Sequence, residues 1–103
     1  MIRIVICDDE KHMSDHIRAM ASDFFRKKNR EIQLRTFLSG EDLLNYDGQI
    51  DILFLDIQMK GMDGMETARK LRADKFRGFL IFITVLKEMV FQSFEVQAYD
   101  YLV

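Results

Sequence analysis

The chain has 103 residues, of which 49% are hydrophobic and 31% are charged, and its formal net charge is −2. This length allows one domain with a hydrophobic core, and the composition is ordinary for a soluble globular protein. The near balance of 15 basic and 17 acidic residues argues against non-specific binding of this segment to nucleic acid or to a membrane surface.

Apolar periodicity predicts the elements of the first half. Residues 2–7, IRIVIC, form a β-branched run that is typical of a strand. A helix is predicted next, because four large apolar residues at helical spacing would form one stripe facing the core: Met13, Ile17, Met20 and Phe24. It ends in the basic run 26–28, where cations suit the helix dipole. The alternating segment 32–37, IQLRTF, predicts a more exposed strand at a sheet edge.

The second half repeats this alternation of helix and strand. Ser39 is the expected N-cap of a short helix that runs through Leu44. A third strand is predicted at 51–55, and Asp63 with Glu66 three residues later predicts a capped helix start. The remaining predicted elements are a strand at 79–83, a helix at 86–96 and a strand at 98–103.

These elements predict an α/β domain with a parallel sheet. The connections between strands are too long for hairpins. The strands at 2–7, 51–55 and 79–83 are nearly continuous apolar runs, as expected when helices cover both faces of a parallel sheet. The chain has no proline, and no repeat or low-complexity segment marks a linker, so one domain is expected over residues 1–103.

The N-terminus and the cysteine content predict a cytoplasmic protein. The first nine residues, MIRIVICDD, end in acids and lack the layout of a secretory signal. No apolar stretch approaches the ~20 residues that span a bilayer. Cys7 is the only cysteine, which excludes an internal disulfide and fits a reducing compartment. Its apolar surroundings favour a small core residue over a reactive thiol.

Polar side chains stand at the ends of three predicted strands. Asp8 and Asp9 follow the first, Asp56 follows the third, and Thr84 follows the fourth. The carboxyl ends of parallel strands form one rim, where ligands bind in open α/β sheets. If these strands are neighbours, the three carboxylates converge and raise one another's pKa unless a cation joins them. Mg²⁺ is the natural partner, and such a site can hold a phosphoryl group.

Four sequence motifs resemble those of a known family: IVICDDE, FLDIQMKGMDGME, FIT and AYDYLV. With them the chain resembles the receiver domains of bacterial two-component response regulators over essentially its whole length. The resemblance implies a flavodoxin-like (CheY-like) doubly wound sheet of five parallel strands in the order 2-1-3-4-5. It also implies that the family's final helix is absent from this chain.

The resemblance also assigns roles to residues. Asp56 would accept a phosphoryl group from the phosphohistidine of a sensor histidine kinase. Asp9 and Asp56 would bind Mg²⁺ together with the backbone carbonyl of Gln58, and Asp8 would act mainly through water. The chain is therefore expected to be a signalling phosphoprotein and not an enzyme.

The same resemblance also implies two residues that change position on phosphorylation and an output domain that responds to them. Thr84 would be the hydroxyl that moves toward the phosphoryl group, and Tyr101 the aromatic side chain that turns inward with it. The segment FEVQAYDYLV is similar to receivers of the LytTR type, which implies a C-terminal output domain that binds DNA and regulates transcription. A homodimer is a further expected partner state, whereas direct contact of this segment with nucleic acid is not expected.

Three features depart from the family pattern. Lys60 stands where receivers usually carry proline, which predicts a more mobile loop. Val85 follows Thr84 where a small residue is usual. The chain ends at Val103, where a Lys-Pro pair usually follows the fifth strand, so we expect a chain truncated before its catalytic lysine.

Two other functions remain open on the residues alone. One is a phosphorylation-independent interaction module that uses the receiver fold as a platform, which the absent lysine leaves in play. The other is a phosphatase with an aspartyl nucleophile of the haloacid dehalogenase type. That class would carry an Asp-x-Asp pattern after the first strand, whereas Asp8 and Asp9 are adjacent.

Overall fold

The structure, a computed structural model of the chain, describes residues 1–83 and 100–102. Its elements are β1 (Ile2–Cys7), α1 (Lys11–Lys27), β2 (Ile32–Phe37), α2 (Gly40–Leu44), β3 (Ile52–Asp56), α3 (Gly64–Ala73), β4 (Phe79–Ile83) and β5 (Asp100–Leu102). The predicted helix at 86–96, with Thr84 and Val85 before it, lies outside the described residues. Of the helices within them, none is long and apolar enough to cross a membrane.

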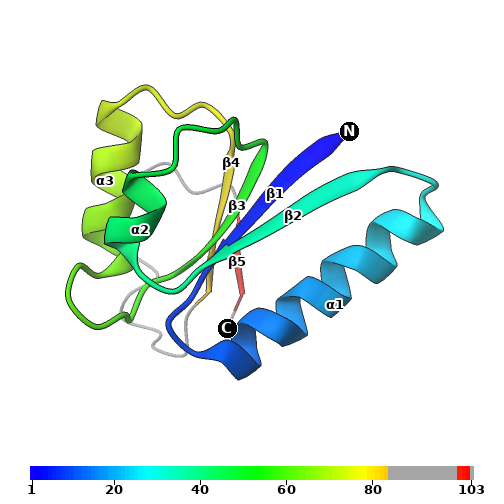
Figure 1. Cartoon of the computed structure of the whole chain (residues 1–103), viewed down its shortest axis with the longest axis horizontal. Helices are drawn as coiled ribbons and strands as arrows, with labels where there is room; N and C mark the ends of the chain where they lie inside the picture. The colour runs from blue at the N-terminus through cyan, green and yellow to red at the C-terminus, as the bar shows by residue number, and fades with distance from the viewer. Residues whose placement is uncertain (84–99, 103) are drawn as a thin grey trace.

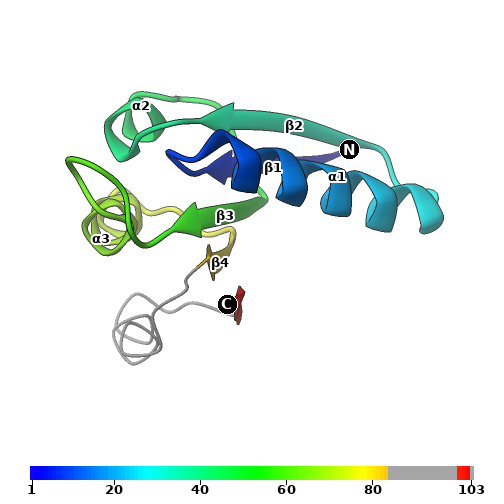
Figure 2. The same cartoon turned by 90° about the horizontal axis from the view of Figure 1, so that it is seen from below.

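The strands form one parallel sheet in the order β2-β1-β3-β4-β5. This confirms the predicted topology, including the edge position of the half-exposed strand β2. Figure 1 shows α2 and α3 on one face of the sheet and α1 on the other. The view from below in Figure 2 shows the arrowheads of β1, β2 and β3 pointing the same way, so the carboxyl ends of these strands lie at one edge of the sheet.

The core on the α2–α3 face explains why β3 reads as an apolar run. Leu53 and Leu55 point to this face and are fully buried, where they pack in one cluster with Leu43 of α2 and Met65 of α3. Alternate strand residues point to opposite faces, and Phe54 accordingly packs with the smaller cluster on the α1 face. Burial on both sides fixes the register of β3 and with it the position of Asp56 at its end.

The buried face of α1 differs from the predicted one. Ser14, Ile17 and Ala21 are buried, whereas Met20 is 44% and Phe24 is 54% exposed. The helix packs on the sheet through Ile17, flanked by the small residues Ser14 and Ala21, whereas Met20 and Phe24 are turned outward. The prediction that Met20 and Phe24 face the core is therefore wrong, although the helix and its basic C-terminal turn are confirmed.

Both predicted N-caps are present and place the loops around the sheet's carboxyl edge. The Ser39 side chain accepts a hydrogen bond from the Asp42 backbone N–H at 3.1 Å, and that of Asp63 accepts one from the Glu66 N–H at 2.9 Å. These bonds satisfy backbone donors in the first turns of α2 and α3. The Asp63 cap ends the β3–α3 loop, residues 57–63, which borders the acidic site.

Candidate functional site

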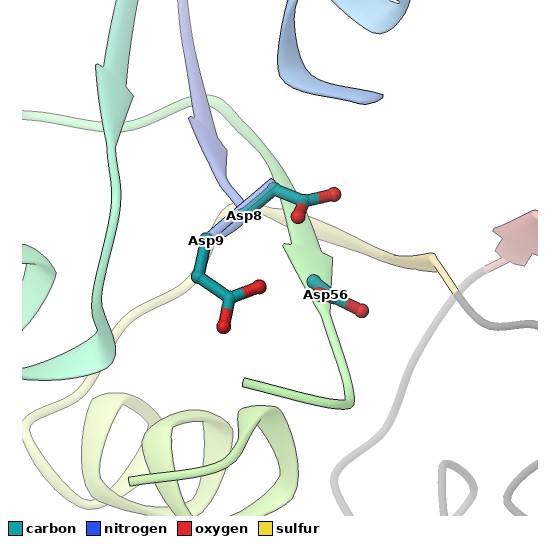
Figure 3. Close-up of side chains that lie close together, drawn as sticks. All are labelled: Asp8, Asp9 and Asp56. Carbon is teal, nitrogen blue, oxygen red and sulfur yellow. The ribbon is translucent and has the colours of Figure 1, made fainter. Parts of the chain in front are cut away.

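Two neighbouring strands bring three aspartates together. Asp8 and Asp9 follow β1 directly, and Asp56 is the last residue of β3. The two strands are parallel, with Cys7 opposite Leu55, so the residues that follow this pair share one edge of the sheet. One carboxylate oxygen from each aspartate lies within 4.8 Å of the others (Figure 3). The structure therefore gathers the three acidic residues that the sequence predicted to converge.

The three carboxylates differ in burial. Asp8 is buried, with 2% of its surface exposed, while Asp56 is partly buried and Asp9 is exposed. Together they line a pocket of about 130 Å³, to whose wall Glu10, Met13, Gln58 and Ile83 also contribute among the described residues. The three acidic side chains therefore run from a buried one, Asp8, to one that is accessible to solvent, Asp9.

Each carboxylate accepts one backbone N–H. Asp8 Oδ1 accepts from the amide of Glu10 at 2.8 Å, and Asp56 Oδ1 accepts from that of Gln58 at 3.2 Å. Both donors lie two residues along the same loop. Asp9 Oδ2 instead accepts from the amide of Lys60 at 3.0 Å, across 51 residues of sequence. One oxygen of each carboxylate is thus held in place by a backbone amide.

The site favours protonated carboxyl groups when no cation is present. Burial raises the pKa of Asp56 to about 7, and the negative charge of Asp8 adds to the rise. Burial likewise raises the pKa of Asp8. Side-chain hydrogen bonding between the two carboxyl groups lowers the pKa of Asp8 and raises that of Asp56, so it favours the proton on Asp56. The predicted mutual repulsion is present, but removal from water is the larger cause.

The donor set fits a hard divalent cation. Mg²⁺ prefers carboxylate oxygens at ~2.0–2.1 Å, with waters completing its shell, so two of its ligands are at most about 4.2 Å apart. The three aspartate oxygens already lie within 4.8 Å of one another, and small side-chain shifts would bring them into one shell. A cation there would also neutralise the charges that raise the pKa of Asp56.

The other predicted site residues are placed to different extents. Gln58 lines the pocket beside Asp56, and the metal contact of its carbonyl stays a prediction. Thr84 lies outside the described residues, directly after Ile83, which lines the pocket. Tyr101 lies in β5, opposite Phe82 of β4, and the inward turn of its side chain stays a prediction.

Three contributions to the site were not predicted from the sequence. Glu10 and Met13 line the pocket because the chain turns directly from Asp9 into α1. Their positions within five residues of Asp8 were the available signal. No sequence signal could have revealed the contact between the Lys60 amide and Asp9. Every residue except proline has a backbone N–H, so the residue type at position 60 shows only that a donor is present.

Cys7 packs below the acidic site as a core residue. It is fully buried, its thiol donates to the Ser39 carbonyl oxygen at 3.4 Å, and its Sγ lies 3.8 Å from Met59 Sδ. Burial raises the pKa of its thiol to about 12, and the negative charges of Asp8 and Asp56 add to the rise. A thiol with this pKa stays protonated and is a poor nucleophile, in agreement with the predicted core role.

The pKa of Asp56 predicts that metal-free stability depends on pH. An unfolded Asp ionises near pH 4, whereas folded Asp56 keeps its proton up to about pH 7. The free energy of unfolding should therefore fall as pH rises from about 4 to 7 and level off above that. Solvent screening of this partly buried group limits the fall to about 1–2 kcal/mol.

Urea denaturation in EDTA at pH 5 and pH 8 measures this dependence. In the Asp56→Asn variant, the side chain at position 56 is uncharged at both pH values. The variant should therefore lose less stability between pH 5 and pH 8 than the wild-type protein. Equal losses for the two proteins would show that Asp56 has an ordinary pKa.

The chain is similar in sequence to known signalling proteins. It matches the response regulator receiver domain family over residues 4–103. It is 29% identical to the sensory transduction protein LytT of Bacillus subtilis, over 99% of this chain and 42% of that protein. It is 27% identical to the transcriptional regulatory protein YpdB of Escherichia coli K12, over 98% of this chain and 41% of that protein. The chain thus spans about two fifths of the length of these relatives.

A solved structure is similar over the whole chain. The response regulator protein TrrA of Thermotoga maritima, determined in complex with Mg(2+)-BeF, superposes with a TM-score of 0.76 at 28% identity, over 100% of this chain and 86% of that one. The family match covers nearly every residue, and the sheet order and acidic strand ends are those that the resemblance implied. The chain therefore belongs to the response regulator receiver domain family of two-component signalling.

Proposed function

We propose that this domain is a Mg²⁺-dependent phosphoacceptor whose phosphorylated residue is Asp56. The observation that carries the proposal is the cluster of Asp8, Asp9 and Asp56 in one small pocket. A carboxyl group with a pKa near 7 among other acids is poised to bind a cation and to ionise when it does. The cation would be held by Asp9, Asp56 and the Gln58 carbonyl, with Asp8 acting through water.

The transfer uses the carboxylate of Asp56 as the nucleophile. Its free oxygen attacks the phosphorus of a phosphohistidine, a P–O bond forms, the P–N bond breaks, and the bonding electrons leave with the imidazole nitrogen. Bound Mg²⁺ supplies charge neutralisation at the phosphoryl oxygens. The Gln58 amide holds the other Asp56 oxygen, so the attacking oxygen faces the pocket. The rigid end of β3 fixes this orientation.

The partners follow from this role. The phosphoryl donor would be a sensor histidine kinase, and the phosphorylated state would shift the population of Thr84 and Tyr101 toward inward positions. The readout would be an output domain of the same protein, of the LytTR type that binds DNA, because LytT is named a sensory transduction protein and YpdB a transcriptional regulator. Residues 1–103 would form the receiver part of this cytoplasmic regulator.

Phosphoryl uptake by the protein at its native length tests the proposal. Incubation with acetyl phosphate and Mg²⁺ should add one phosphoryl group per chain, measured by intact-mass spectrometry, and excess EDTA should prevent the addition. A protein that binds Mg²⁺ but gains no mass would contradict phosphoacceptor function. Failure of both Mg²⁺ binding and phosphoryl uptake would favour the phosphorylation-independent interaction module instead.

A further inference from the structure

The hydrogen bond from the Lys60 amide to Asp9 Oδ2 joins the two loops that frame the site. Asp9 belongs to the β1–α1 loop, and Lys60 lies in the middle of the β3–α3 loop, at 3.0 Å. Gly61 follows with a φ of +74°, a left-handed conformation that favours glycine and turns the chain directly after the donor. Among the described residues, the Asp9 carboxylate accepts no hydrogen bond other than this one.

Asp9 and the β3–α3 loop border a common open cavity. Its volume is about 450 Å³, and its lining residues are Asp9, Ile57, Gln58, Met59, Lys60 and Asp63. Asp9 is exposed, so its carboxylate would otherwise be free to rotate into water. Figure 3 shows it instead turned toward the space that it shares with Asp56. The amide contact is therefore the direct restraint on this side chain.

We propose that the backbone N–H of Lys60 is a positioning group that orients Asp9 for Mg²⁺, an inference that rests on the proposed function. By holding Oδ2, it leaves Oδ1 for the cation and lowers the entropy lost when the cation binds. It also keeps the β1–α1 and β3–α3 loops at a fixed separation before the cation arrives. The carboxylate cluster is then largely formed in the metal-free protein.

The identity of residue 60 decides whether this contact can exist. Proline has no N–H, so a chain with proline at this position would lack the donor. The lysine therefore adds a fixed link between the loops at a position where a mobile loop was predicted. The Lys60 side chain is exposed and is not needed for the contact, since any residue except proline supplies the amide.

Comparison of Lys60→Pro with Lys60→Ala tests the inference. Both lose the lysine side chain, and only Lys60→Ala keeps the N–H. Isothermal titration of the metal-free proteins should give a Mg²⁺ dissociation constant about tenfold higher for Lys60→Pro than for Lys60→Ala, as for loss of one hydrogen bond to a charged group. Replacing the amide of residue 60 by an ester, which removes the N–H without the proline ring, should weaken binding in the same direction.

The outcomes separate the inference from the proposed function. A purely structural role would lower the unfolding temperature of Lys60→Pro and of the ester protein but leave their Mg²⁺ affinities equal to that of Lys60→Ala. Equal affinities, with normal phosphoryl uptake by the wild-type protein, would overturn the role of Lys60 alone. A wild-type protein that binds no Mg²⁺ would overturn both.

Discussion

Asp56→Asn is expected to abolish phosphoryl uptake from acetyl phosphate while leaving the fold intact. An amide is not a nucleophile at neutral pH, but it matches the carboxylate in size and still accepts the Gln58 N–H, which reaches the wild-type Asp56 oxygen at 3.2 Å. Asp8 and Asp9 remain in place. The loss should therefore exceed ~100-fold in initial rate, as expected when a covalent nucleophile is removed. Intact-mass spectrometry over time measures it.

Asp51→Asn is the matched control for this substitution. Asp51 precedes β3 at its opposite end, where its carboxylate accepts the Arg3 N–H at 2.8 Å. An asparagine oxygen can accept the same bond, so this variant should be phosphorylated at close to the wild-type rate. If Asp56→Asn took up phosphate as fast as Asp51→Asn, the nucleophile would lie elsewhere.

Gly64→Ala is expected to cause the largest loss of stability among single methyl additions near the site. A Cβ at Gly64, the first residue of α3, would lie 2.1 Å from the Asp56 carbonyl oxygen and 2.7 Å from Ile57 Cα. The Gly64 N–H also donates to the Ile57 carbonyl at 2.8 Å, which fixes this close approach. Backbone atoms cannot rotate away, so unfolding free energy should fall by about 3 kcal/mol. Mg²⁺ affinity should fall too, since the same backbone carries Asp56.

Gly40→Ala separates this effect from a general cost of adding a methyl group. Its Cβ would meet the Thr67 hydroxyl oxygen at 2.1 Å. This buried hydroxyl can rotate away, but it then loses its hydrogen bond to the Asp63 carbonyl oxygen, at a total cost of about 2 kcal/mol. Urea denaturation should therefore give a lower free energy of unfolding for Gly64→Ala than for Gly40→Ala. Gly40→Ala should also keep the Mg²⁺ affinity of the wild-type protein. Equal stability and Mg²⁺ affinity for the two variants would show that the Asp56 backbone accommodates the methyl group.

The fold could be predicted largely because its strands are buried on both faces. Continuous apolar runs such as 51–55 identify interior parallel strands, and the alternating 32–37 identifies an edge. The buried face of α1 could not be predicted in the same way. The spacing of large side chains correctly included Ile17, but it also included the exposed Met20 and Phe24 and omitted the small buried residues Ser14 and Ala21.

The acidic site was predictable for a related reason. Strand ends in a parallel sheet meet at one rim, so Asp8, Asp9 and Asp56 had to converge once their strands were neighbours. The fine geometry was not predictable. The restraint on Asp9 comes from a backbone amide, and the high pKa of Asp56 depends first on its burial, which a pattern of residue types does not measure.

The most direct test of the central claim is to locate the phosphoryl group. Borohydride reduces an aspartyl phosphate to homoserine, so phosphorylated protein that is reduced, digested and sequenced by mass spectrometry reports the modified residue. Our account predicts homoserine at position 56 of the wild-type protein, dependent on Mg²⁺, with Asp8 and Asp9 unmodified. Homoserine at either of those positions, or a phosphoryl group on a residue other than an aspartate, would contradict it.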